Sequence, residues 1–184
     1  MSSTGDNHTV CDGRTADRIT KVDHVALTVP SMTEAATFFR DVVGGTFLCG
    51  GDNDETGVRL MHWMLPGFKL ELMQPLRSDS LISEAMRRRG PGFHHMTFLV
   101  DDIPRTVEAL RADGCEPIDT DTRLSAWSET FLSPRATFGA LLQFVSTDLR
   151  WDTPTHDYTC EDVLAGRIVW RNYIACAREN HQIA

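Results

Sequence analysis

Four polar side chains recur at matched points of this chain and together could hold a metal ion. The interval in the sequence from His24 to His95 nearly equals the interval from Glu71 to Gln143. Imidazole nitrogens and carboxylate or amide oxygens bind divalent first-row metals at roughly 2.0–2.2 Å from the ion. The spacing therefore predicts one shared centre, to which each half of the chain contributes two ligands. Zinc, cobalt, nickel, manganese or iron would suit two nitrogens and two oxygens.

The two histidines sit in similar segments of the sequence. Residues 21–29 and 92–100 both contain a histidine, run on through apolar residues that favour a strand, and stop where a polar residue can cap a helix. The offset that relates the two histidines also matches Val29 with Val100. A strand, a helix and three further strands can be read in each half, which predicts two tandem βαβββ modules that share one core.

The predicted elements divide the chain into four parts. The first module, residues 20–89, has expected strands at 21–29, 46–49, 58–64 and 68–73 and helices at 32–43 and 81–88. The second module, residues 92–147, has expected strands at 94–100, 116–120, 129–133 and 140–146 and a helix at 104–113. A polar leader, expected to be flexible, covers residues 1–19. A C-terminal extension, with a helix expected at 163–177, covers residues 148–184.

The composition bounds the function. With 184 residues and 41% hydrophobic content, the chain can bury one sizeable core. Its formal net charge of −8 argues against nucleic-acid binding, which rests on lysine and arginine neutralising phosphates. No apolar run approaches the roughly 20 residues that span a bilayer, so no membrane association is expected. The five scattered cysteines favour a reduced, cytoplasmic location.

Five short segments carry a family resemblance: Asp23–Leu27, Glu71–Leu76, Arg77–Ser80, Gly92–Met96 and Val100–Ile103. In this order they resemble the vicinal oxygen chelate superfamily, which includes glyoxalase I, methylmalonyl-CoA epimerase and extradiol dioxygenases. The resemblance is strongest to the epimerases and covers about residues 20–147. It implies an α+β fold in which the two βαβββ modules form a curled mixed sheet around a metal site. It also places that family's metal ligands on His24, Glu71, His95 and Gln143.

The resemblance further implies where protons would be moved. Epimerases of this type have a proton-abstracting glutamate in a Glu-x-Gly-Val segment, and Glu55 begins such a segment here. Position 143 looks to be a glutamate in the epimerases, serving as ligand and second base. Gln143 can bind a metal through its carbonyl oxygen but cannot accept a proton. Glu55 and Glu71 are therefore the two candidate catalytic carboxylates, and His94, next to the ligand His95, is expected to have a supporting role.

These residues lead to one expected function and several alternatives. We expect a metal-dependent isomerase similar to methylmalonyl-CoA epimerase, which removes a proton next to a carbonyl through a metal-stabilised enolate. Its substrate would be a small molecule, such as an acyl-CoA or a related β-dicarbonyl compound. Alternatives of the same fold are a glyoxalase-like lyase or isomerase, an iron(II) dioxygenase that uses His24, His95 and Glu71, and a binding protein of the bleomycin-resistance kind. A homodimer, common in the superfamily, is compatible with all of them.

Each of these residues also has an ordinary interpretation. A single histidine on an apolar strand is more often a hydrogen-bonded core residue than a ligand, and a strand glutamine is usually hydrogen-bonded. Glu55 lies in an acidic loop, where a solvated carboxylate is as frequent as a catalytic base. The matched offsets of the four ligand candidates are what favour the metal site.

Overall fold

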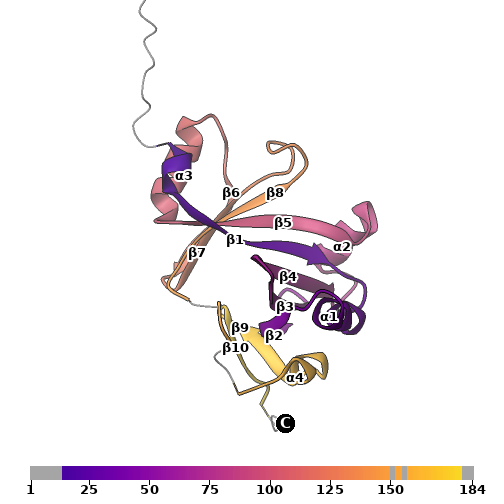
Figure 1. The fold of residues 1–184 in the computed structure, drawn as a ribbon. Coiled ribbons are helices and arrows are strands. Elements are labelled where there is room, and N and C mark those ends of the chain that lie inside the picture. The colour runs from indigo at the N-terminus through magenta and orange to yellow at the C-terminus, as the bar shows by residue number, and fades with distance from the viewer. Residues whose placement is uncertain (1–13, 150–151, 155–156, 180–184) are drawn as a thin grey trace, which may run out of the picture.

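The fold is built on a single ten-stranded sheet. The computed structural model describes residues 14–149, 152–154 and 157–179. The strand order is β10-β9-β2-β3-β4-β1-β5-β8-β7-β6 (Figure 1). The strands are β1 (Ile19–Thr28), β2 (Thr46–Asn53), β3 (Val58–Leu65), β4 (Phe68–Pro75), β5 (Gly92–Val100), β6 (Ile118–Leu124), β7 (Trp127–Leu132), β8 (Leu141–Thr147), β9 (Ile168–Arg171) and β10 (Ile174–Ala177).

The two predicted βαβββ modules are confirmed by the pairing of the strands. In the first module β1 runs parallel to β4, and β2, β3 and β4 form an antiparallel meander. In the second module β5 runs parallel to β8, and β6, β7 and β8 form the matching meander. The antiparallel pair of β1 and β5 joins the modules at the middle of the sheet. Residues at equivalent points of the two modules therefore meet along this central seam.

Helix caps explain where the main helices begin. In α1 (Met32–Asp41) the side chain of Ser31 accepts a hydrogen bond from the backbone N–H of Glu34. In α3 (Ile103–Ala112) Asp102 accepts from the N–H of Arg105, and Pro104 occupies the first turn, where its missing N–H is not needed. The helix α2 (Leu81–Arg89) begins in the same way behind Ser80. The three helices expected within the modules are confirmed, with ends shifted by at most a couple of positions.

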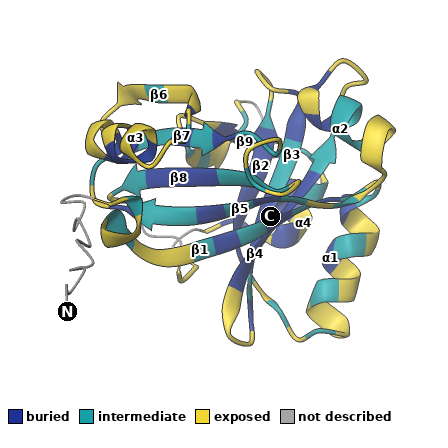
Figure 2. Ribbon diagram, turned by 90° about the horizontal axis from the view of Figure 1, so that it is seen from above, coloured by how far each residue is buried: buried dark blue, intermediate teal, exposed yellow. Residues whose placement is uncertain are grey.

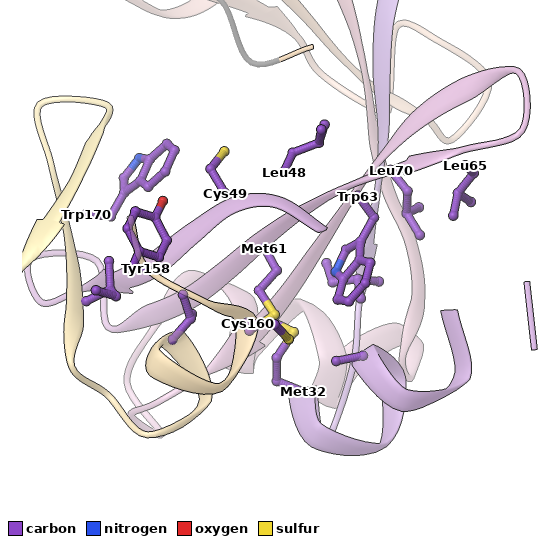
Figure 3. Close-up of a cluster of buried hydrophobic side chains, with 14 residues drawn as sticks. Met32, Leu48, Cys49, Met61, Trp63, Leu65, Leu70, Tyr158, Cys160 and Trp170 are labelled. Carbon is purple, nitrogen blue, oxygen red and sulfur yellow. The ribbon is translucent and has the colours of Figure 1, made fainter. Parts of the chain in front are cut away.

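The largest part of the core lies between the first module and the C-terminal extension. Side chains from α1 and from α4 (Cys160–Leu164) pack on β2 and β3. Burial runs along the middle of β2, β4 and β8, whereas β6 at the edge of the sheet has no buried residue (Figure 2). Met32, Met61 and Cys160 converge there (Figure 3). Trp63 and Met61 are completely buried. A second cluster of buried hydrophobic side chains lies between α3 and the strands of the second module.

The helix expected at 163–177 is wrong. The extension instead forms the short helix α4 and a hairpin of β9 and β10, and β9 pairs in parallel with β2 at the edge of the first module. Gly166, with φ +72°, ends the helix after little more than a turn, and Asn172 and Tyr173, with φ +49° and +63°, make the tight turn of a hairpin. The apolar run at Ile168 is therefore a buried strand. A short apolar run fits a buried strand and a buried helix equally well, so the sequence pattern alone does not distinguish them.

Strand β2 extends further than the segment 46–49 expected from the sequence. Gly50 and Gly51, which looked like part of a polar turn, lie inside it between β3 and β9. A Cβ atom at Gly50 would lie 2.6 Å from the carbonyl oxygen of Leu60, and one at Gly51 would lie 3.0 Å from the carbonyl carbon of Val169. The absence of side chains at these two positions lets the neighbouring strands approach from both sides.

The chain ends differ from the expectation in part. Residues 15–18 of the expected leader form a short 3-10 helix, and β1 begins at Ile19. Residues 1–13 lie outside the described residues. Within the described chain, no helix is long and apolar enough to cross a membrane. The four described cysteines are all free thiols.

Candidate metal centre

The register of the central strands brings two of the predicted ligands together. Ala26 of β1 lies opposite Glu71 of β4 on one side and opposite His95 of β5 on the other. Neighbouring strands place paired side chains on the same face of a sheet. Glu71 and His95 therefore flank the small side chain of Ala26, and both are buried.

The same arrangement recurs at the matching point of the second module. Thr97 of β5 lies opposite His24 of β1 on one side and opposite Gln143 of β8 on the other. His24 and Gln143 are buried as well. Residues two apart on a strand share a face, so the two sets of ligands project from the same face at the seam between the modules. All four predicted ligands thus lie at the centre of the sheet.

The donor atoms of His24, Glu71 and His95 are spaced as metal ligands would be. One carboxylate oxygen of Glu71, Oε2, lies 3.6 Å from Nε2 of His24 and 3.5 Å from Nε2 of His95. The three ligand atoms all lie within 4.8 Å of one another. Atoms bound at about 2.1 Å to one ion are themselves roughly 3.0–3.5 Å apart. These residues therefore fit a divalent metal ion.

A third imidazole, His62 of β3, belongs to the same buried cluster. It is paired with Glu71 across the strands, and its Nε2 lies 3.6 Å from Oε1 of Glu71. Its ring centre is 5.3 Å from that of His24. The sequence did not indicate that His62 belongs to this cluster, because His62 has no polar counterpart in the repeat. His62 lies opposite Glu71 in the first module, and the residue opposite Gln143 in the second module is Phe131. A histidine inside an otherwise apolar strand was the only available signal.

Neighbouring side chains orient the two histidines that are candidate ligands. Nδ1 of His24 lies 2.8 Å from a carboxylate oxygen of Asp23, which also forms a 2.8 Å ion pair with buried Lys69. Because the carboxylate of Asp23 lies against Nδ1, Nε2 is the ring nitrogen of His24 that faces the cluster. Nδ1 of His95 lies 2.9 Å from Nδ1 of His94, which leaves Nε2 of His95 toward Glu71. This contact gives His94 a supporting position.

The cluster holds Glu71, His62 and His95 in the protonation states that metal binding needs, whereas the pKa of His24 is shifted in the opposite direction. Burial lowers the pKa of His62 and of His95 to about 3, although the charge of Glu71 acts in the opposite direction. Burial acts to raise the pKa of Glu71, but its hydrogen bond with His24 and the nearby imidazoles outweigh burial and lower it. Burial likewise acts to lower the pKa of His24, but Asp23 and Glu71 raise it overall. Glu71 is thus an anion beside neutral His62 and His95 near neutral pH.

Gln143 points one end of its amide at the cluster. Its carbonyl oxygen, Oε1, accepts a 2.6 Å hydrogen bond from the hydroxyl of Thr97, and that hydroxyl lies 3.0 Å from Nε2 of His24. A hydrogen bond with Gln143 also contributes to the pKa of His95. The amide nitrogen, Nε2, donates to Glu129 on β7 at 2.7 Å. The oxygen is therefore the end of Gln143 that a metal ion would meet.

Glu55 lies apart from the ligand cluster. It is an exposed residue of the turn between β2 and β3, and it lines a cavity of about 370 Å³ together with the tip of the C-terminal hairpin. Trp170 of β9 is also part of this cavity wall, and its ring centre is 5.9 Å from that of His62. Trp170 thus lies beside both this cavity and the imidazole of His62.

Comparison with known proteins shows the family of the chain. Residues 23–131, more than half of the chain, match the model of the Glyoxalase/Bleomycin resistance protein/Dioxygenase superfamily. The chain belongs to this superfamily. The same family is known as the vicinal oxygen chelate superfamily, so the resemblance seen in the sequence is confirmed.

Among individual relatives, the uncharacterised protein YqjC of Bacillus subtilis is 31% identical over 125 residues, which cover 67% of this chain and 89% of the relative. The mitochondrial methylmalonyl-CoA epimerase of Mus musculus is 30% identical over 129 residues, covering 68% of this chain and 72% of the epimerase. A crystallised Streptomyces coelicolor methylmalonyl-CoA epimerase variant, in complex with 2-nitronate-propionyl-CoA, is 26% identical with a TM-score of 0.62. It aligns over 71% of this chain and 99% of its own, so part of this chain has no counterpart there.

Proposed function

We propose that this superfamily member is a metal-dependent isomerase that moves a proton on a carbon next to a carbonyl, as methylmalonyl-CoA epimerase does. The observation that carries the proposal is the buried set of His24, Glu71 and His95, with donor atoms of the histidines 3.5–3.6 Å from the carboxylate. Burying a carboxylate among imidazoles is unfavourable unless the charges are compensated. A bound divalent cation would provide that compensation.

The residues of the chain have separate tasks in this proposal. When bound, a divalent cation supplies Lewis-acid stabilisation of negative charge that develops on substrate oxygens. His24, Glu71 and His95 would hold the ion, with the carbonyl oxygen of Gln143 as a fourth ligand. Glu55, at the rim of the cavity, and Glu71, in the cluster, are the carboxylates that could take up the substrate proton. Gln143 cannot do so, which makes proton transfer from two opposite faces dependent on these two residues.

An acyl-CoA is the substrate class that the relatives favour. The Streptomyces coelicolor enzyme binds a propionyl-CoA analogue, and several relatives carry the name methylmalonyl-CoA epimerase. The cavity of about 370 Å³ beside Glu55 is large enough for a short acyl group but not for a whole coenzyme, and none of the four ligand candidates lines it. The arginines at the end of α2 are a weak anchor for coenzyme phosphates, because Arg87 and Arg88 both pair with Glu84.

Exchange of the substrate proton tests the proposal directly. Metal-loaded protein is incubated with methylmalonyl-CoA in deuterated water, and mass spectrometry follows deuterium at the carbon between the two carbonyls. We expect incorporation by the wild type, at least about 100-fold slower exchange by His95→Ala, and wild-type exchange by Glu108→Gln, a substitution at an exposed helix position. Folded, metal-loaded protein that exchanges no faster than buffer would contradict the proposal for this substrate.

A dioxygenase is the second candidate, and one observation favours it. Two histidines and one carboxylate that converge on one point are the ligand set of non-haem iron(II) oxygenases. Oxygen consumption by the iron(II)-loaded protein with a catechol distinguishes the two reactions. Uptake of oxygen without deuterium exchange would replace the isomerase proposal by this one.

A further inference from the structure

The amide of Gln143 has two ends of similar shape and opposite chemistry. Its carbonyl oxygen can bind a cation, whereas its NH₂ group only donates hydrogen bonds and would repel one. The hydroxyl of Thr97 does not decide between the two orientations by itself, since a hydroxyl can either donate or accept. A side chain at position 143 therefore needs a partner on its outer side that accepts and cannot donate.

Glu129 is that partner. Its Oε2 accepts hydrogen bonds from Nε2 of Gln143 at 2.7 Å and from the indole N–H of Trp127 at 2.9 Å. A carboxylate has no hydrogen to donate, so it selects the NH₂ end of the amide and leaves the oxygen toward the histidines. Glu129 also places a negative charge beside the neutral side chain of Gln143. At position 143 the resemblance implies a glutamate in the epimerases.

The C-terminal extension holds this carboxylate in place. The hydroxyl of Tyr173 donates to Oε1 of Glu129 at 3.0 Å, and the ring of Tyr173 stacks on that of Trp127 with the centres 4.6 Å apart. Tyr173 sits at the turn between β9 and β10 with φ +63°, a conformation that bulky residues rarely adopt. The hairpin thus pairs with β2 of the first module through β9 and contacts β7 of the second module through Tyr173 (Figure 1).

We infer that Glu129 is a positioning residue that fixes the amide of Gln143 with its oxygen toward the metal centre. Tyr173 of the C-terminal hairpin holds Glu129 in this position through its hydrogen bond. The consequence for the metal rests on the proposed function, whereas the orientation of the amide is a property of the protein alone. Two hydrogen bonds, from Tyr173 to Glu129 and from Gln143 to Glu129, thus connect a segment outside the two modules to the centre between them.

Cobalt(II) binding tests the consequence for the metal. Affinity and the visible d–d spectrum are measured for the wild type, Glu129→Leu, Glu129→Gln and the control Glu108→Leu on the exposed side of α3. Leucine keeps the side-chain bulk but removes the acceptor, so we expect a roughly 10–100-fold weaker affinity and an altered spectrum. The indole N–H of Trp127 only donates, so glutamine at position 129 would present its carbonyl oxygen to that N–H and to Gln143. Glu129→Gln should therefore retain the affinity and the spectrum, which a purely electrostatic role would not allow. In a Gln143→Ala background, Glu129→Leu should have no further effect on affinity.

Nuclear magnetic resonance of the metal-free protein tests the orientation separately. The side-chain amide signals that vanish in Gln143→Ala should form one sharp set in the wild type and in Glu129→Gln. In Glu129→Leu they should broaden or double, because both orientations become populated, and Tyr173→Phe should show a weaker form of the same change. Wild-type signals and wild-type cobalt affinity in Glu129→Leu would overturn the inference. One sharp set in a wild type that binds no cobalt would instead refute the proposed function and leave the positioning role standing.

Discussion

Ala26 and Thr97 occupy equivalent positions in the two modules, and only Thr97 carries a hydroxyl. Each is completely buried between a histidine and a polar residue of the neighbouring strands. The methyl group of Ala26 makes no hydrogen bond, whereas the hydroxyl of Thr97 contacts both Gln143 and His24. The two halves of the centre are therefore alike in backbone and different in chemistry, with a carboxylate on one side and a hydrogen-bonded amide on the other.

Replacing Thr97 by valine tests this asymmetry. Valine has nearly the same shape as threonine, so the packing is retained. The buried carbonyl oxygen of Gln143, however, loses the hydrogen bond that the hydroxyl donates. We expect the free energy of unfolding to fall by about 1–2 kcal/mol in urea titrations of the metal-free protein. Thr97→Ser, which keeps the hydroxyl, should lose less than half of that amount. Equal losses in the two variants would show that the methyl group, and not the hydroxyl, is what matters.

The histidine that the repeat does not predict should be less important for the metal than the predicted ones. His62 approaches Oε1 of Glu71, whereas His24 and His95 both approach Oε2. We expect His62→Phe to retain one metal ion per chain with affinity reduced less than about 10-fold, consistent with a neighbour of the ligands. A complete loss of metal from a folded His62→Phe variant would place His62 among the ligands.

The ion pair behind His24 should contribute strongly to stability. The side chains of Lys69 and Asp23 are only 5% and 7% exposed, and their charged atoms are 2.8 Å apart. Lys69→Met leaves the carboxylate of Asp23 without its buried counter-charge, which should cost about 3–5 kcal/mol of unfolding free energy. Lys21→Met is the matched control: Lys21 lies 4.0 Å from the same carboxylate but is half exposed, so its removal should cost less than about 1 kcal/mol. Comparable losses in the two variants would contradict this assignment.

The glycine pair inside β2 gives a prediction for the fold itself. Gly50→Ala would bring a Cβ atom against the backbone of β3, and we expect it to destabilise the protein by about 1–3 kcal/mol. Gly44→Ala is the control, because Gly44 has open space around it and is disfavoured only by its positive φ of +78°, roughly 1 kcal/mol. Thermal unfolding followed by circular dichroism measures both. A smaller loss at Gly50 than at Gly44 would mean that β2 can move away from β3.

The convergence of the four ligand candidates was predictable because the repeat carries them. Nearly the same offset relates His24 to His95 and Glu71 to Gln143, and the strand register places all four on one face. A histidine that has no counterpart in the repeat, His62, could not be found in this way. Its role depends on the pairing of β3 with β4, which no local pattern specifies.

The contribution of the C-terminal extension was not predictable for a different reason. Its apolar residues fit a helix by spacing, and only Gly166 and the tight turn at Tyr173 indicate a hairpin. Whether that hairpin docks on β2 or stays apart is decided by long-range packing against the first module. The link from Tyr173 to Glu129 exists only after this docking.

Metal content is the measurement that tests the central claim most directly. The protein is purified, incubated with an excess of each divalent first-row metal, freed of unbound ion and analysed by mass spectrometry beside His95→Ala and Glu108→Gln. The geometry of His24, Glu71 and His95 predicts close to one ion per chain in the wild type and in Glu108→Gln, and almost none in His95→Ala. Equal metal content in the wild type and a folded His95→Ala variant, or none in either after incubation, would contradict a metal centre at the seam of the two modules.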